Sequence, residues 1–130
     1  MTSSSETIGF VGIGLMGQGM AKNLIEKGYP LSTIAHRNRK PLEDLVARGA
    51  TEAASLEDLA SRSSIIFLCL TGAPEAASVV ASLKPGLKPG TVIVDCSTGE
   101  PTVTARLAAE MAGIGVDYAD APLGRTPKEA

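Results

Sequence analysis

The chain is poor in the residues that build metal sites and disulfide frameworks. Its 130 residues include one histidine, two cysteines and no tryptophan. Cys69 and Cys96 have no metal-ligand spacing to each other or to His36, so we expect no metal site. We interpret both cysteines as reduced thiols, in the core or at the edge of a site, of a cytoplasmic protein.

Long apolar runs and clusters of one charge are also scarce. No run approaches the roughly 20 apolar residues of a membrane span, and residues 1–6 lack the apolar stretch of a signal peptide. The formal net charge is −2, and basic residues gather only around Arg37 to Lys40. This distribution indicates neither nucleic acid nor a membrane surface as a partner. A soluble protein acting on a small charged metabolite fits better.

What the chain does have is an alternation of short β-branched runs with amphipathic segments, which is typical of βα units on a parallel sheet. We predict a doubly wound α/β fold, with residues 1–6 as a disordered N-terminus and residues 7–130 as one domain. Six strands are expected, and five can be placed, over residues 7–11, 31–35, 64–70, 91–94 and 116–120. Helices are predicted from the glycine-rich segment to Gly28, over 41–48, from Ser55 in a capping box, over 74–83 and over 100–111.

The most informative motif is a G-x-G-x-x-G that follows the first strand and opens the first helix. Gly12 permits the tight turn, Gly14 lets the backbone approach a pyrophosphate, and Gly17 lets the helix pack close to the strand. The backbone N–H groups of Leu15 and Met16 then face the diphosphate from the positive end of the helix. The motif therefore predicts dinucleotide binding by a Rossmann domain.

The end of the second strand indicates which dinucleotide is preferred. An NAD site usually places a carboxylate there, on the ribose hydroxyls, whereas this chain has Ala-His-Arg-Asn-Arg-Lys over residues 35–40. Arg37 can pair with a 2′-phosphate, and Asn38 or Arg39 adds a second donor. We predict NADP as the preferred cofactor, with NAD possible; the alternative is a solvated basic loop. His36 is interpreted as a loop residue beside the adenosine.

These segments resemble the N-terminal domain of the β-hydroxyacid dehydrogenase family, which includes 3-hydroxyisobutyrate and 6-phosphogluconate dehydrogenases. The resemblance runs from Ile8 to about Ala130. It is carried by residues 9–17 with Met-Ala-Lys-Asn-Leu at 20–24, by Asp-Cys-Ser-Thr at 95–98 and by Asp-Ala-Pro at 120–122. It implies a Rossmann NAD(P)-binding domain whose C-terminal helical partner domain is absent from this chain.

The resemblance also implies roles for individual residues. Leu15 and Met16 line the pyrophosphate, Arg37 and Asn38 lie at the adenosine ribose, Leu70 and Thr71 lie beside the cofactor, Thr98 lies near the nicotinamide and Ser97 helps to hold the acidic group of the substrate. Ser97, with Glu100 three residues later, could instead cap the next helix, and Thr71 could cap the helix that contains Pro74. Asp95 and Asp120 are expected to accept backbone N–H bonds at strand-end loops.

The last segment departs from the usual family pattern. Leu-Gly-Arg-Thr over 123–126 replaces a small residue, serine and two glycines, as in the sulfolactaldehyde reductase branch that this segment resembles. With Ser97, the substrate contacts are then Gly124, Arg125 and Thr126. Arg125 suits a carboxylate, sulfonate or phosphate, so the predicted substrate is a small anionic hydroxyacid or its aldehyde. The alternative is a surface arginine.

The proton-transferring lysine of the family lies in the absent C-terminal domain, so no catalytic residue is assigned here, and Lys128 is interpreted as solvated. We predict the cofactor-binding part of an NAD(P)-dependent 3-hydroxyacid dehydrogenase or reductase, homo-oligomeric when intact, and inactive as this chain alone. The alternatives are a non-catalytic dinucleotide-binding or redox-sensing module, and a domain for another nucleotide or a flavin.

Overall fold

The computed structural model describes residues 7–12, 15–34, 40–69, 73–96 and 101–120, and these contain one six-stranded sheet. The strand order is β3-β2-β1-β4-β5-β6, and each neighbouring pair is parallel. The winding reverses between β1 and β4, which is the doubly wound Rossmann order. The predicted fold class is therefore confirmed. The strands are β1 (Ile8–Val11), β2 (Leu31–Thr33), β3 (Thr51–Glu52), β4 (Ile65–Leu68), β5 (Val92–Asp95) and β6 (Asp117–Asp120).

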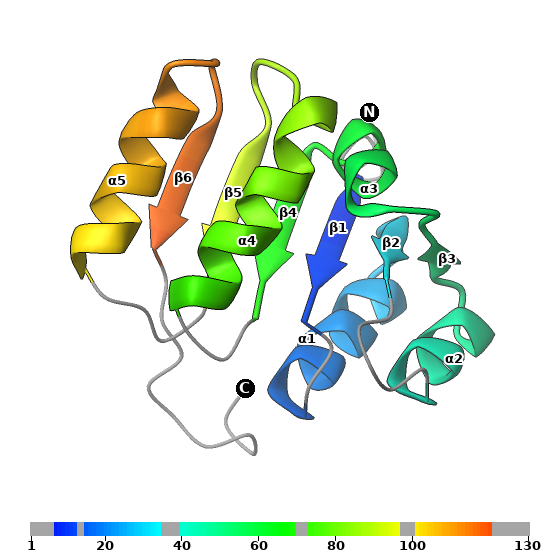
Figure 1. Cartoon of the computed structure of the whole chain (residues 1–130). Helices are drawn as coiled ribbons and strands as arrows, with labels where there is room; N and C mark the ends of the chain where they lie inside the picture. The colour runs from blue at the N-terminus through cyan, green and yellow to red at the C-terminus, as the bar shows by residue number, and fades with distance from the viewer. Residues whose placement is uncertain (1–6, 13–14, 35–39, 70–72, 97–100, 121–130) are drawn as a thin grey trace.

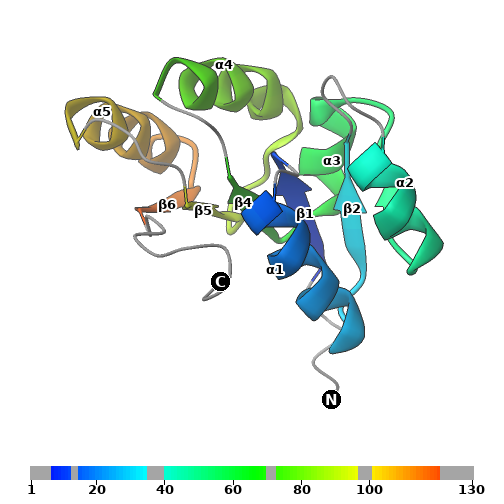
Figure 2. The same cartoon turned by 90° about the horizontal axis from the view of Figure 1, so that it is seen from below.

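Helices cover both faces of this sheet. Helices α1 and α2 lie on one face, over the β1–β3 half, whereas α3, α4 and α5 lie on the other face (Figures 1 and 2). Each helix lies in the connection between two consecutive parallel strands, which need a crossover to be joined. The helices are α1 (Leu15–Glu26), α2 (Lys40–Ala47), α3 (Leu56–Arg62), α4 (Ala73–Leu83) and α5 (Pro101–Ala112), with a 3₁₀ turn, η2 (Lys84–Gly86), after α4.

The core is divided into two apolar clusters by the sheet, and β4 contributes to both. Ile66 and Leu68 are fully buried in the cluster on the α3–α5 face, while Ile65 and Phe67 pack against the cluster on the α1–α2 face. Successive side chains of a strand point to opposite faces. A strand buried on both faces therefore reads as a continuous apolar run, which is why β4 has no alternating pattern.

The ends of α1 and α2 share one hydrogen-bond pattern. The N–H of Tyr29 donates to the carbonyl of Leu24 at 3.2 Å, and the N–H of Ala50 donates to the carbonyl of Leu45 at 3.0 Å. Each bond joins residues five positions apart and spans a glycine. Such a bond closes a helix by satisfying a carbonyl in its last turn. The stops predicted at Gly28 and Gly49 are thus confirmed.

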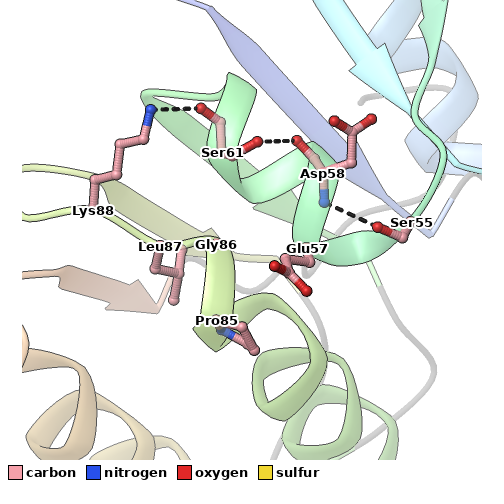
Figure 3. A pocket seen from close by; sticks show the side chains of 8 residues that line it. All are labelled: Ser55, Glu57, Asp58, Ser61, Pro85, Gly86, Leu87 and Lys88. Carbon is pink, nitrogen blue, oxygen red and sulfur yellow. Dashed lines mark hydrogen bonds between the residues drawn. The ribbon is translucent and has the colours of Figure 1, made fainter.

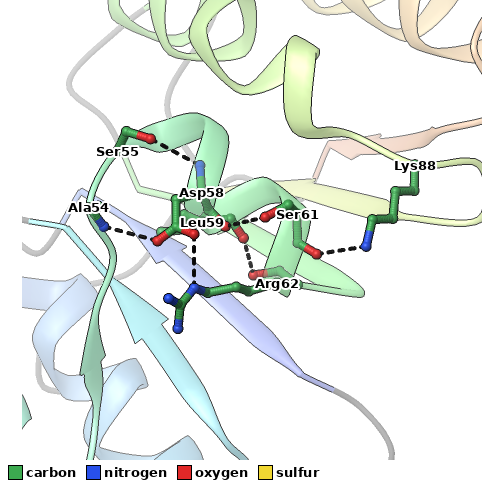
Figure 4. Close-up of polar contacts among 8 residues, drawn as sticks. Ala54, Ser55, Asp58, Leu59, Ser61, Arg62 and Lys88 are labelled. Atoms are coloured by element: carbon green, nitrogen blue, oxygen red, sulfur yellow. Dashed lines mark hydrogen bonds and ion pairs between the residues drawn. The ribbon is translucent and has the colours of Figure 1, made fainter.

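The cap of α3 differs from its predicted form. The Ser55 hydroxyl accepts from the N–H of Asp58 at 3.1 Å, as a capping box requires (Figure 4). The Asp58 carboxylate, however, accepts from the N–H of Ala54 at 3.0 Å rather than from Ser55, and it also pairs with Arg62. The bond from Ala54, followed by that from Arg62, lowers the pKa of Asp58.

Strand boundaries are where the sequence prediction was least accurate. The unplaced third strand is β3, whose two residues are both exposed and so carry no apolar period. β2 ends at Thr33 and β4 at Leu68, both earlier than predicted, whereas β5 continues one residue further, to Asp95. Residues 1–6, expected to be disordered, lie outside the described residues.

Candidate dinucleotide site at the carboxyl edge of the sheet

Four strands of the sheet end at the same level along the strand direction. Val11 pairs with Leu68, Leu68 with Asp95, and Asp95 with Asp120, so the last residues of β1, β4, β5 and β6 form one row across the sheet. The hydrogen bonds between the strands continue one residue beyond this row. The N–H of Cys69 donates to the carbonyl of Val11 at 2.9 Å, and the N–H of Cys96 donates to the carbonyl of Leu68 at 2.7 Å. The loops that follow all leave the sheet from one line, beside the switch point where open α/β sheets bind ligands.

Gly12 is the first residue of the loop after β1. Its φ angle is +92°, in the region that side-chain-bearing residues rarely adopt. The chain turns there, and α1 begins at Leu15, with Gly17 in its first turn. A glycine turn that leads into a helix N-terminus presents backbone N–H groups to an anion. The positive φ angle is the tight turn expected at Gly12, whereas its contact with a diphosphate stays a prediction.

The second strand is fixed to the first near the same edge. The hydroxyl of Thr33, which is fully buried, donates to the carbonyl of Phe10 at 2.9 Å. Phe10 and Thr33 are also partners in the register of β1 and β2. The chain therefore leaves β2 beside the strand that leads to the glycine turn, and its sequence continues into the basic segment that contains Arg37 and Asn38.

Asp95, the last residue of β5, is 3% exposed and accepts a 2.5 Å hydrogen bond from the phenol of Tyr118 on β6. Such a short distance is typical of a bond to a carboxylate. We expected Asp95 to accept backbone N–H groups; the phenol is a partner that the sequence did not reveal. Tyr118 pairs in register with Ile93, two residues before Asp95, so only the register of β5 and β6 could have indicated this contact.

The two cysteines lie side by side at this edge. Cys69 follows β4 and is half-buried, whereas Cys96 follows β5 and is buried; neither is in a disulfide. A hydrogen bond between the two thiols, together with burial, raises the pKa of Cys69. The interpretation of both as site-edge thiols agrees with this placement.

Most other residues predicted for the site lie outside the described residues. They are Gly14, Arg37, Asn38, Leu70, Thr71, Ser97, Thr98, Gly124, Arg125 and Thr126, and of Leu15 and Met16 only the backbone is described. What the structure does place is the sheet residue from which each of these segments departs. The assignments of individual contacts therefore stay predictions.

A pocket of about 580 Å³ lies elsewhere, between α3 and the connection from η2 to β5 (Figure 3). Lys88 reaches across it to the carbonyl of Ser61 at 2.9 Å, and Gly86 packs so closely on α3 that a Cβ there would meet the carbonyl oxygen of Glu57. Because α3 and η2 lead into the starts of β4 and β5, this pocket is near the amino edge of the sheet. It is not near the glycine turn.

Two further features concern only the part of the chain that the structure describes. None of its helices combines the length and apolar character needed to cross a bilayer. Among the same residues, no group of three or more His, Cys, Asp or Glu side chains is arranged to hold a metal ion.

Comparison with known proteins gives a consistent result. Residues 7–130 match the family model of the NAD binding domain of 6-phosphogluconate dehydrogenase. The chain is 35% identical over 126 residues to 2-(hydroxymethyl)glutarate dehydrogenase of Eubacterium barkeri, and 32% identical over 126 residues to 3-sulfolactaldehyde reductase of Escherichia coli. Each alignment covers 95% of this chain and 42% of the relative. The chain thus spans less than half the length of these relatives.

Among solved structures, an imine reductase from Pseudomonas sp. has the same architecture. The TM-score is 0.85 at 28% identity, and the alignment covers 95% of this chain and 43% of that one. The matched part again excludes more than half of the other protein.

Proposed function

The chain belongs to the β-hydroxyacid dehydrogenase family, whose NAD-binding domain it matches over residues 7–130, and we propose that it binds the nicotinamide dinucleotide of a hydroxyacid dehydrogenase or reductase. The observation that carries the proposal is the common row of strand ends beside the left-handed Gly12. That row brings together four loop origins that are far apart in the sequence. A dinucleotide is long enough to contact all of them.

NADP is the cofactor we propose as preferred. The support comes from Arg37 and Asn38, which follow β2 where an acidic residue would otherwise select the ribose hydroxyls of NAD. A guanidinium can hold a 2′-phosphate with two parallel hydrogen bonds. Under this proposal the diphosphate lies at Gly12, Gly14 and the N–H groups of Leu15 and Met16. Leu70 and Thr71 lie beside the cofactor, and Thr98 lies near the nicotinamide.

The proposed substrate is a small anionic hydroxyacid or its aldehyde. Ser97, Gly124, Arg125 and Thr126 would hold its acidic end beside the nicotinamide, which supplies or accepts the hydride. The lysine that exchanges the hydroxyl proton would come from the part of the protein beyond this chain. We further propose that the intact protein is a cytoplasmic homo-oligomer with no nucleic-acid or membrane partner.

The test is a titration of the chain with NADPH and with NADH, followed by nicotinamide fluorescence. We expect tighter binding of NADPH. Arg37→Ala should weaken NADPH binding by about tenfold or more, which is about 1.4 kcal/mol, and leave NADH almost unchanged. Arg48→Ala is the matched control, because it removes the same charge from an exposed ion pair with Asp44 on α2.

The outcomes separate the alternatives. If the two cofactors bind equally and Arg37→Ala changes neither affinity, the NADP preference is contradicted. The proposal of a dinucleotide site would still be supported. Binding of neither cofactor by a folded chain would contradict the proposed function and favour a domain for another nucleotide or a flavin.

A further inference from the structure

The ends of β4 and β5 place the only two cysteines of the chain opposite each other. Leu68 and Asp95 are register partners, and the N–H of the next residue, Cys96, still bonds to the carbonyl of Leu68 at 2.7 Å. Cys69 and Cys96 are therefore the next pair in the ladder. Paired residues on neighbouring parallel strands point to the same face of the sheet, so the two side chains lie next to each other.

The spacing suits a covalent link. Neighbouring strands are about 4.8 Å apart, and disulfides join Cα atoms that are about 4.4 to 6.8 Å apart. The two thiols already share a hydrogen bond. Closing a bond between them requires side-chain rotation and a small adjustment of the strand ends, without any separation of β4 from β5.

Only one of the two thiols is open to reagents. Cys69 is half-buried, and Cys96 is 6% exposed. A small oxidant would therefore react first at Cys69, and Cys96 lies where the resolving thiol of a dithiol pair must be. Such a neighbouring thiol competes with hydrolysis or further oxidation of the first adduct because it is already in contact.

We propose that Cys69 and Cys96 are a reversible dithiol–disulfide couple, closed by a small organic disulfide such as oxidised glutathione. The thiolate of Cys69 attacks one sulfur of the oxidant and expels a glutathione thiolate. The thiolate of Cys96 then attacks the Cys69 sulfur of the mixed disulfide and releases the second glutathione. The two cysteines together lose two electrons and two protons, and the oxidant becomes two thiols.

The position of the couple predicts a consequence for the site. Cys69 and Cys96 directly precede the segments that contain Leu70 and Thr71, and Ser97 and Thr98. A disulfide would tie the origins of both segments together. We expect it to weaken dinucleotide binding by about tenfold, and bound dinucleotide to oppose closure by the same factor, because such coupling is reciprocal. This consequence, unlike the disulfide itself, rests on the proposed function.

The reaction rate should depend on pH in one direction. The hydrogen bond with Cys96, burial and the nearby charge of Asp95 raise the pKa of Cys69, so little of this thiol is ionised at neutral pH. Thiolate is the attacking species. Closure is therefore slow at pH 7 and accelerates steadily as the pH rises, since each pH unit below the pKa increases the thiolate fraction about tenfold.

The experiment equilibrates the chain in glutathione buffers of increasing oxidising strength, blocks remaining thiols with an alkylating reagent and measures the intact mass. We expect a species lighter by two hydrogen atoms that takes up no alkylating reagent and returns to the dithiol with a reductant. Cys69→Ser and Cys96→Ser are the matched controls; neither variant should form this species, and each should carry one glutathione at most.

The proposed couple would be contradicted if the wild-type chain stays fully alkylated at every ratio of oxidised to reduced glutathione. It would also be contradicted if only glutathione adducts accumulate. If the oxidised chain binds NADPH as tightly as the reduced chain, the proposed effect of the disulfide on dinucleotide binding is wrong. A reduced chain that binds neither NADPH nor NADH would contradict the proposed function instead, and the mass measurement would still decide whether the disulfide forms.

Discussion

Gly9 lies in β1 where this strand passes closest to α3. A Cβ built on Gly9 would be 2.5 Å from the hydroxyl oxygen of Ser63 and 2.7 Å from a methyl carbon of Leu59. Both neighbours are buried, so neither has room to withdraw. We expect Gly9→Ala to lower the free energy of unfolding by about 1–3 kcal/mol through overpacking, measured by urea denaturation.

The matched control is a second glycine with free space around it. Gly19 lies inside α1, and apart from its chain neighbours and the backbone of its own helix, no atom of the described residues is within 4 Å of the position of its Cβ. Gly19→Ala should raise the stability by up to about 1 kcal/mol, because alanine has the higher helix propensity. Equal effects of the two substitutions would contradict the close contact of β1 with α3.

Asp58 provides a pH-dependent test, also at the residue scale. Its pKa is lowered from 3.8 in the folded chain by the bonds from Ala54 and Arg62. A lowered folded pKa contributes stability that is present above the unfolded value and is lost as the pH falls through the folded value. The wild type should therefore melt at a slightly higher temperature than Asp58→Asn at pH 7, and the gap should close below pH 3.8.

Asp58 is exposed enough for solvent to reduce this effect, so a small difference is expected. Glu57→Gln, which removes the same charge from the neighbouring exposed position, is the control. If its pH profile follows that of Asp58→Asn, the general charge of the helix terminus, and not the cap, is responsible.

At the scale of elements, the bond from Tyr118 to Asp95 joins β6 to β5. β6 is the last strand of the described sheet, with a sheet neighbour on one side. Tyr118→Phe removes the hydroxyl and keeps the ring, which packs against the larger core cluster. We expect a loss of about 1.5–3 kcal/mol in the free energy of unfolding, the usual contribution of a hydrogen bond to a charged group.

Tyr29→Phe removes the other phenol of the chain, in the turn between α1 and β2, and serves as the control. Hydrogen exchange separates the two effects, because loss of the cross-strand bond should speed exchange of the β6 amides selectively. Uniform acceleration over the whole sheet would contradict a local role for Tyr118.

The elements were predictable from sequence where apolar residues, caps and glycines act locally. The stop of α1 at Gly28, the cap at Ser55 and the apolar run of β4 are all local signals. β3 was not placeable, because a two-residue exposed strand has no period. The partnerships of Tyr118 with Asp95 and of Cys69 with Cys96 depend on strand order and register, which bring together residues 23 and 27 positions apart.

For the whole molecule, dinucleotide binding and folding are linked. A ligand that binds only the folded chain, at a concentration 100 times its dissociation constant, stabilises it by about 2.7 kcal/mol. For a chain of 130 residues this corresponds to a rise in melting temperature on the order of 10 °C. We expect NADPH to produce this rise, measured by differential scanning calorimetry.

Gly12→Ala should abolish most of that rise, since it strains the left-handed turn that presents the N–H groups of the anion site. The comparison is made between melting temperatures with and without NADPH for each variant, so the intrinsic cost of the substitution cancels. If NADPH raises the melting temperature of Gly12→Ala as much as that of the wild type, the turn at Gly12 is not part of the binding site.

The level ends of β1, β4, β5 and β6 also separate the sheet, as a scaffold, from the loops that follow these strands. The loops after these four strands start from the same row, Val11, Leu68, Asp95 and Asp120, and loops tolerate changes in length better than the strands that they connect. Loop segments grafted from the 2-(hydroxymethyl)glutarate dehydrogenase or 3-sulfolactaldehyde reductase relatives would begin at a common origin. We therefore expect such grafts to change the loops while the sheet stays as it is.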